Sequence, residues 1–246
     1  MVAALLRGSL ASGQDSQQLY REGIRLLTAG QTGAAAEMLR KSVALRPANA
    51  PAWKALGVVL ASQGKTEDAE PAFRNACERD PSLEDACLYY GRVLYLLDRL
   101  EPALEALRQA VKIRDTGEAR RLQALSLEAL GRGAEAETEF RTAIRLGGSG
   151  SPDEDPGIDY GVFLYRQGRV ADAVPPLESA LQRHPDSARA HLELGCVLLA
   201  LDRLSEAASH LERSLILKDS PRAHQLLAKA YLRMGKTELA EPHLKK

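Results

Sequence analysis

The sequence predicts an all-α fold made of about seven stacked helical hairpins. Within residues 50–82, apolar and small residues recur at helical spacing in two segments that Gly64 separates. This pattern repeats along the chain with a period near 34 residues. The composition agrees, because aromatic residues make up only 4% of the 246 residues and hydrophobic residues 45%, with many alanines and leucines, as is typical of helices.

The hairpin at residues 50–82 shows the expected packing most clearly. Its first helix carries Trp53 and Gly57, and its second helix carries Phe73 and stops before Pro81. Small residues allow the two helices to approach closely, and the two large aromatic side chains fill the volume between them. One such hairpin cannot bury its apolar faces alone, so copies are expected on both sides.

The number of copies follows from equivalent alanines. They step by 34, 34, 33, 37, 34 and 33 residues and are Ala35, Ala69, Ala103, Ala136, Ala173, Ala207 and Ala240. The first-helix glycines Gly23, Gly57 and Gly91 follow the same period. Seven registers at one period indicate a repeat array, in which chain length sets the number of hairpins rather than the size of a single core.

These residues resemble the tetratricopeptide repeat (TPR) family from about residue 16 to the C-terminus. The family pattern of 34 residues is matched by Trp53, Leu56, Gly57, Ala69, Phe73 and Pro81. The resemblance implies a right-handed α-α superhelix, that is, a solenoid of about seven TPR hairpins. It says little about function, because the shared residues are those that pack one hairpin on the next.

The first hairpin is expected at residues 16–49, with Asp15 or Ser16 as its N-cap and Gly30 in its turn. The residues before it are ambiguous, since they contain a short apolar run and small residues that suit a cleavage site. We interpret residues 1–15 as a tail that is either disordered or the remnant of a signal peptide.

The third hairpin begins near residue 84 and has Asp98 where the others have a turn glycine. The fourth, at residues 117–146, matches the pattern least well. Residues 147–157 then cannot continue a helix, and we interpret them as a longer surface turn, with a hinge as the alternative. The predicted organisation is a tail at 1–15, hairpins one to four at 16–147, a Gly/Ser/Pro/acidic turn at 148–156 and hairpins five to seven at 157–246.

The three cysteines, Cys77, Cys87 and Cys196, are odd in number and form no CxxC motif. Each falls at a mostly apolar place in a predicted helix, so we expect packing thiols and no disulfide framework, with a redox role as the alternative. We expect the protein in the cytoplasm. If residues 1–11 are a signal remnant, the protein is exported, for example to a periplasm.

No catalytic or cofactor-binding motif is present: there is no P-loop, no dinucleotide fingerprint and no nucleophile elbow. We predict no enzyme activity and no cofactor. All five histidines lie in the last third of the chain, at His184, His191, His210, His224 and His243. Their spacing lacks a compact ligand motif, so we predict no metal site and keep a metal-binding protein only as a further alternative.

The charge is balanced, with 33 Lys and Arg against 33 Asp and Glu. A net charge of zero removes the general electrostatic attraction to nucleic acid or to an anionic membrane. No apolar run approaches the length of about 18 residues that spans a bilayer. We expect neither nucleic acid nor a membrane as partner, and a protein or peptide instead.

The resemblance implies that the first helices line a concave groove that holds a bound peptide. At the implied positions, cationic and aromatic side chains outnumber acids. The candidates are Lys54, Tyr89, Arg92, Tyr95, Arg121, Tyr165, Arg166, Arg189, Arg222, Lys229 and Arg233. Such side chains suit a segment that carries Asp, Glu or a free C-terminus. The alternative is a solvated face whose long side chains pair with neighbouring acids.

We therefore predict a non-enzymatic scaffold or adaptor that binds a peptide segment of a partner protein in this groove. One alternative is a self-assembling structural repeat protein, in which the last hairpin or apolar residues 2–6 dock on another copy. Another is that the chain is the recognition part of a larger multidomain protein.

Overall fold

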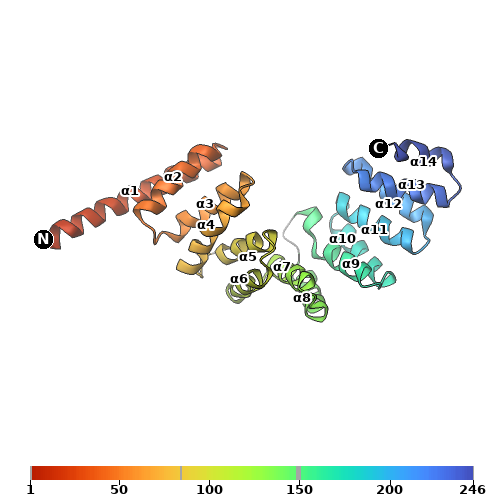
Figure 1. The fold of residues 1–246 in the computed structure, drawn as a ribbon, viewed down its shortest axis with the longest axis horizontal. Coiled ribbons are helices and arrows are strands. Elements are labelled where there is room, and N and C mark those ends of the chain that lie inside the picture. Colours follow the sequence, from red (N-terminus) through yellow and green to blue (C-terminus); the bar gives the residue numbers. More distant parts are fainter. Residues whose placement is uncertain (1, 84, 148–150, 246) are drawn as a thin grey trace. The chain divides into compact units, whose positions relative to one another are not determined.

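The computed structural model describes residues 2–83, 85–147 and 151–245, with side chains from residue 14 onward. Within these residues the chain forms fourteen α-helices and two short 3₁₀ helices, which confirms the predicted all-α class. The helices fall into two compact units, Met1–Asp115 (unit 1) and Thr116–Lys246 (unit 2) (Figure 1). The residue ranges predicted for the four-hairpin and three-hairpin parts remain a prediction.

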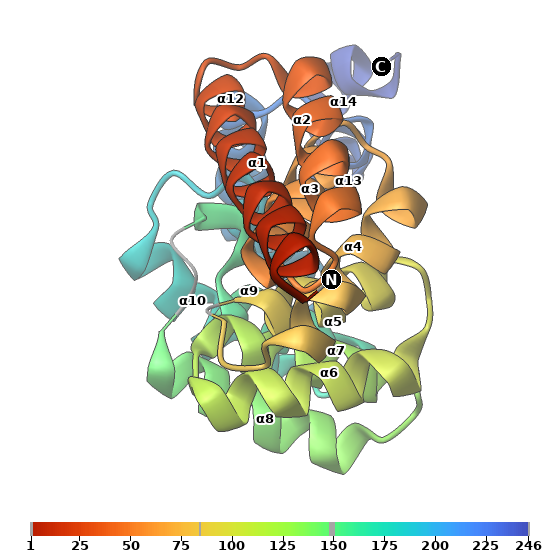
Figure 2. The same ribbon diagram turned by 90° about the vertical axis from the view of Figure 1, so that its left-hand side faces the viewer.

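Unit 1 consists of three helical hairpins, each a first helix packed on a second. They are α1 (Val2–Thr28) with α2 (Thr32–Leu45), α3 (Ala50–Ser62) with α4 (Thr66–Arg79), and α5 (Ala86–Leu96) with α6 (Leu100–Ile113). Figure 2 shows α1 lying beside α2. Neighbouring hairpins meet where α2 packs on α3 and α4 packs on α5.

Unit 2 consists of four hairpins of the same kind. They are α7 (Gly117–Ala129) with α8 (Gly133–Leu146), α9 (Pro156–Arg166) with α10 (Val174–Arg183), α11 (Ala188–Ala200) with α12 (Leu204–Leu217), and α13 (Pro221–Arg233) with α14 (Thr237–Leu244). Two 3₁₀ helices, η1 (Pro152–Glu154) and η2 (Ala171–Ala173), precede α9 and α10. Because α8 packs on α9, stacking continues across residues 147–157, of which 148–150 lie outside the described residues.

The first-helix glycines mark the closest approach between paired helices. A Cβ atom at Gly91 would lie 2.5 Å from Cγ of Leu107, and one at Gly195 would lie 2.7 Å from Cγ of Leu211. Real Cβ atoms do not approach other carbons this closely, since interiors are already packed to contact. Glycine therefore recurs at this position of the first helix because the second helix packs too closely against it for a larger residue.

The turns inside the hairpins require a left-handed backbone. Gly64 has φ of +73°, and Asp98 takes the same region with φ of +57°. Aspartate is among the few non-glycine residues that visit this region. Asp98 thus replaces the turn glycine, as the sequence predicts, and Asp202 does so again in unit 2 with φ of +61°.

The first helix begins earlier than predicted. Helix α1 starts at Val2, so the expected N-cap at Asp15 or Ser16 is wrong. Ser16 is instead fully buried, where its hydroxyl lies 3.0 Å from the carbonyl oxygen of Ser42 on α2. A small side chain fits this tight contact between helices, and its hydroxyl is satisfied by the hydrogen bond to Ser42. Serine is also a common N-cap residue, which is why the sequence suggests a cap here.

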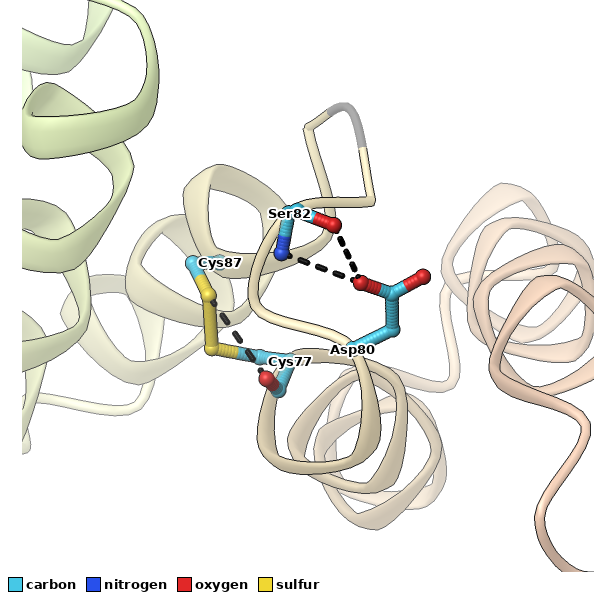
Figure 3. Close-up of a disulfide and its surroundings, with 4 residues drawn as sticks. All are labelled: Cys77, Asp80, Ser82 and Cys87. Carbon is cyan, nitrogen blue, oxygen red and sulfur yellow. Dashed lines mark hydrogen bonds between the residues drawn. A yellow bond between two sulfur atoms is a disulfide. The ribbon is translucent and has the colours of Figure 1, made fainter.

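A disulfide joins hairpins two and three, contrary to the expectation of packing thiols. Cys77 at the end of α4 bonds Cys87 in the first turn of α5, ten residues later, and Cys196 stays a free thiol. Figure 3 shows the bond beside the loop in which Asp80 accepts hydrogen bonds from the backbone and hydroxyl of Ser82. The pairing was missed because the loop returns the chain, so that helices on different repeats bring the two positions together.

Candidate functional site

The predicted binding residues all lie on first helices. In unit 1 they occupy α3 and α5, and in unit 2 they occupy α7, α9, α11 and α13. Within unit 2 these helices are neighbours, since α9 packs against both α7 and α11, and α11 packs against α13. The surface of each unit formed by these helices is called its first-helix face.

In unit 1 the predicted residues are partly buried on α3 and α5. Tyr89, Arg92 and Tyr95 occupy successive turns of α5, and Lys54 occupies α3. The ring centres of Tyr89 and Phe73 lie 5.5 Å apart, an ordinary spacing for an aromatic pair. The core thus supports this cluster of side chains, each of which keeps part of its surface exposed.

In unit 2 a buried ion pair joins α7 to α9. Nη1 of Arg121 donates to Oδ2 of Asp159 at 2.9 Å, and only 7% and 4% of these side chains is exposed. Glu154 lies 3.6 Å from Nη2 of Arg121. Arg121 therefore belongs to the contact between hairpins and is not an exposed cation on a binding surface.

A second arginine shares the Asp159 carboxylate. Nη2 of Arg189 on α11 donates to Oδ1 of Asp159 at 2.5 Å, and its Nη1 donates to the carbonyl oxygen of Asp153 at 2.9 Å. One carboxylate thus links α7, α9 and α11. Removing it would leave two arginines without their shared counter-charge.

Three further predicted arginines also pair with acids. The pairs are Arg166 with Glu128 at 3.1 Å, Arg222 with Glu193 at 2.7 and 2.9 Å, and Arg233 with Asp202 at 2.7 Å. The two hydrogen bonds that Arg222 donates to Glu193 raise the pKa of Arg222, although partial burial opposes this. We call these residues, together with Arg121, Asp159 and Arg189, the first-helix ladder. These ion pairs are the contacts predicted by the alternative interpretation, in which the long side chains of this face pair with neighbouring acids.

Tyr165 and Lys229 complete the predicted set. Tyr165 on α9 is partly buried, and the charge of a Cys196 thiolate together with burial raises the pKa of its phenol. Lys229 on α13 is exposed. The structure thus brings Tyr165 next to the ladder and leaves Lys229 at the surface.

Asp155 holds the start of α9, the helix that carries Asp159. It caps the helix by accepting from the backbone N–H of Gly157 at 2.7 Å, and it receives two hydrogen bonds from Arg183 of α10. Burial alone would raise the pKa of Asp155, but the bonds from Arg183 and Gly157 hold it below its usual value. This ion pair fixes the helix from which Asp159 projects.

The sequence reading missed the acidic members of the ladder. A signal was present, because arginines and acids of opposite charge stand on first helices 29 to 38 residues apart. Positions one repeat apart on the same helix face become neighbours when hairpins stack. Comparing charges across repeats, and not only within one helix, would have found these pairs.

The described residues hold no cluster of three or more His, Cys, Asp or Glu side chains with the arrangement of a metal site. None of the helices they form is long and apolar enough to cross a membrane. What the first-helix faces present is paired charge and partly exposed tyrosine.

Comparison with known families agrees with this architecture. Residues 60–126 and 164–229 match one form of the tetratricopeptide repeat, residues 20–84 match a second form, and residues 221–246 match a third. The chain belongs to the tetratricopeptide repeat family. A TPR protein is in general a scaffold for protein–protein interaction, because stacked repeats present an extended surface to a partner.

One named relative of this TPR protein is an inactive TPR repeat-containing thioredoxin of Arabidopsis thaliana. The two are 35% identical over 104 residues, which is 42% of this chain and 15% of the relative. Because the chain spans only 15% of that protein's length, the relative's own activity is not carried over.

Solved structures of several TPR-like proteins resemble this TPR protein. Three of them are Cut9 in its complex with Hcn1 (TM-score 0.71, 19% identity, 88% of this chain and 42% of that chain), pilF of Pseudomonas aeruginosa (0.68, 21%, 89% and 99%) and a TPR protein of Parabacteroides merdae (0.71, 16%, 94% and 91%). At these identities the similarity shows the fold alone. The predicted TPR fold is confirmed, whereas the binding role of each candidate residue stays a prediction.

Proposed function

We propose that this TPR protein is a non-enzymatic adaptor that binds an extended segment of a partner protein on the first-helix face of unit 1. The observation that supports this most directly is the α5 cluster of Tyr89, Arg92 and Tyr95, which the core supports and which stays partly exposed. Tyrosine gives rigid contact area and arginine forks a carboxylate, so the preferred segment carries Asp, Glu or a free C-terminus.

In unit 2 the first-helix ladder would compete with an acidic segment for the predicted arginines. In unit 2 each predicted arginine already holds an internal carboxylate, and the Arg121 pair is almost completely buried. An acidic peptide would have to displace these partners. The ladder therefore acts mainly as structural support for the stacked helices of unit 2, and the proposed recognition site is the partly exposed cluster of α5.

The experiment is a pull-down from the native extract with the intact chain and with Arg92→Glu, read by mass spectrometry. The matched control is Lys229→Glu, which makes the same charge change at an exposed position of α13. Arg121→Glu is unsuitable, because it would place another acid beside Asp159 and Glu154 and destabilise the packing. Circular dichroism checks that all variants keep their helix content.

A protein captured by the intact chain and by Lys229→Glu, but lost with Arg92→Glu, supports the assignment. Equal capture by all three places the interface elsewhere on the array. Synthetic copies of the captured segment, with a free or an amidated C-terminus, then tell side-chain carboxylates from the terminal carboxylate.

The disulfide supports an oxidising compartment rather than the cytoplasm, since structural disulfides are rare where glutathione keeps thiols reduced. The exported alternative is thus the better proposal for location. Alkylation in intact cells with a thiol reagent of known mass tests it. We expect labelling of one cysteine, Cys196. Labelling of all three cysteines would indicate a reducing compartment and contradict the proposal.

Self-association is a second candidate function, supported by exposed leucines on the last hairpin. Leu232, Leu239 and Leu244 expose 46%, 49% and 61% of their surface. Contacts between such residues on two copies would bury apolar area. Light scattering over a wide concentration range tests this, and a constant monomer mass would contradict it.

A further inference from the structure

Two histidine pairs occupy equivalent positions in the last two hairpins. The first pair is His191 of α11 with His210 of α12, whose Nδ1 atoms lie 3.0 Å apart. The second is His224 of α13 with His243 of α14, whose Nδ1 atoms lie 2.6 Å apart. In both pairs the partners are 19 residues apart. Each pair therefore ties a first helix to its own second helix.

The geometry of the pairs decides between a metal site and a hydrogen bond. The ring centres lie 5.2 and 4.9 Å apart, so in each pair the two Nδ1 atoms lie between the rings and face each other. A zinc ion needs both nitrogens about 2.0–2.1 Å from one common point. Because the two Nδ1 atoms point at each other, no point at that distance lies along the lone-pair directions of both rings. They fit an Nδ1–H···Nδ1 hydrogen bond, in which one ring donates and the other accepts.

The outer nitrogens identify the donor in the first pair. Nε2 of His191 lies 3.1 Å from the carbonyl oxygen of Pro185, and a carbonyl oxygen can only accept. His191 therefore carries its proton on Nε2, and its Nδ1 accepts. His210 must then donate from Nδ1.

The second pair repeats this arrangement with a different outer acceptor. Nε2 of His224 lies 2.8 Å from Oδ1 of Asp219. Since an ionised carboxylate only accepts, His224 carries its proton on Nε2 and His243 donates from Nδ1. The same ring plays the same role in both hairpins.

Counting protons shows what acid does to each pair. In the first pair, the first extra proton binds the outer Nε2 of the donor ring, His210, and leaves the bond between the rings in place. The second must bind Nδ1 of the acceptor ring, where the shared proton already lies. Two N–H groups and two positive charges then face each other, and the hydrogen bond is lost.

We propose that these histidine pairs form an acid-sensitive lock, which holds α11 against α12 and α13 against α14 at neutral pH and opens both hairpins when each pair gains its second proton. The lock depends only on residues of unit 2 and is independent of what the chain binds. Its opening leaves the hairpins without such pairs, α7 with α8 and α9 with α10, in place.

The surroundings of the first pair set the direction of the response. Burial lowers the pKa of both His191 and His210 from the ordinary 6.5, and His191 lowers that of His210 further. The charged groups that act on this pair are Asp186 and Glu206, which favour protonation, and Arg203 and Arg213, which oppose it. Because the unfolded chain takes up protons first, the contribution of this pair to the stability of the α11–α12 hairpin is complete above pH 6.5. It falls as the pH drops toward the lowered pKa values.

The second pair has its own set of neighbours. Asp219 contacts His224 directly, and the ring of Tyr231 on α13 lies 6.2 Å from that of His243. The Tyr231 hydroxyl donates to Glu212 of α12, which packs against α13. Asp219 and Glu212 are thus the acidic groups nearest to this pair for which contacts are found.

The first test is nitrogen NMR of the imidazole rings in the intact chain. At about pH 7.5, His191 and His224 are expected with the proton on Nε2, and His210 and His243 with it on Nδ1. Acid titration should show two steps for each pair. One common tautomer for all four rings, or four independent single-step titrations near the ordinary value, would overturn the proposal.

The second test compares hydrogen exchange of the hairpins at about pH 7 and pH 5, corrected for the pH dependence of intrinsic exchange. For each histidine whose pKa falls by one unit, protection in α11–α14 should drop by about tenfold, while that in α7 and α8 does not. Uniform loss in all four hairpins of unit 2 would contradict a local lock.

The chain itself offers a matched replacement for the pairs. At the equivalent position of the fourth hairpin, Arg120 donates to Glu139 at 2.9 Å, again 19 residues apart. A variant with His191→Arg, His210→Glu, His224→Arg and His243→Glu should lose the acid response, whereas His184→Gln should keep it. If that variant does not fold, the double variant His210→Gln with His243→Gln is used instead, because the glutamine amide can still donate a hydrogen bond to the facing Nδ1. If the chain takes up Zn²⁺ stoichiometrically and the NMR signals of all four rings shift, the histidines form a metal site and the proposed lock is wrong.

Discussion

Units 1 and 2 build the same hairpin but join neighbouring hairpins in different ways. In unit 1 the Cys77–Cys87 disulfide crosses from α4 to α5. In unit 2 the first-helix ladder crosses from one first helix to the next, centred on Asp159. The comparison teaches that the repeat pattern sets the hairpin and leaves the chemistry of the junction open. The two units should therefore respond to different conditions.

Loss of the central ladder carboxylate should have the largest effect. Asp159→Ala takes from the buried Arg121 the nearer of its two carboxylates, and breaking a buried pair from one side costs about 3–5 kcal/mol. Urea unfolding followed by circular dichroism measures this free energy. Asp172→Ala is the control, because its pair with Arg169 is exposed and such pairs contribute about 0–1 kcal/mol. Equal losses for the two variants would contradict a special role of Asp159.

Reduction of the disulfide should destabilise unit 1 by about 2–3 kcal/mol, because the bond closes a short loop in the unfolded chain. The measurement is the urea midpoint with and without reductant, assigned to units by hydrogen exchange. Cys196→Ser should leave the difference unchanged, since that thiol is not bonded. A loss of protection in unit 2 alone would break the proposed contrast between the units.

Overpacking of the glycine contact should affect both units alike. Gly91→Ala in unit 1 and Gly195→Ala in unit 2 each place a methyl group within 2.7 Å of a buried leucine, so each should cost about 1–3 kcal/mol. Thermal unfolding of the two variants measures this. Gly33→Ala is the control, because nothing lies within 4 Å of its added Cβ. Costs that differ widely between the units would mean that the hairpin itself, and not only its junctions, has diverged.

Relief of the left-handed turn should have the smallest effect, and a stabilising one. Asp98→Gly removes a side chain from a backbone with φ of +57° and should gain up to about 1 kcal/mol. Asp202→Gly should gain less, since it also removes the pair with Arg233. Denaturant midpoints check both, and a loss of stability in Asp98→Gly would show that its side chain holds the turn.

Most of the fold was predictable because its information is local. The alanine and glycine period, the turn at Gly64 and its replacement at Asp98 all depend on contacts within one hairpin or between adjacent ones. Two features were not predictable in this way. Helix α1 continues upstream of Ser16, and the Cys77 disulfide depends on how a loop returns the chain.

The candidate site was predictable only in position. The resemblance places Arg92, Arg121 and Arg222 on first helices, and they are found there. It did not reveal that Arg121 is buried against Asp159 or that Glu193 holds Arg222, because a residue's accessibility depends on the charges that the next hairpin brings against it.

The sequence by itself determined the hairpin, its period and the family, since these follow from which small and apolar residues recur every 34 positions. The tertiary structure alone decided which charges are neutralised, which cysteines bond and which histidines face each other. The physical reason is that hydrogen bonds and ion pairs depend on distances of a few ångströms between groups 10 to 38 residues apart. The spacing of residues in a repeat limits which groups can be neighbours, and the packing of one hairpin on the next decides the distance between them.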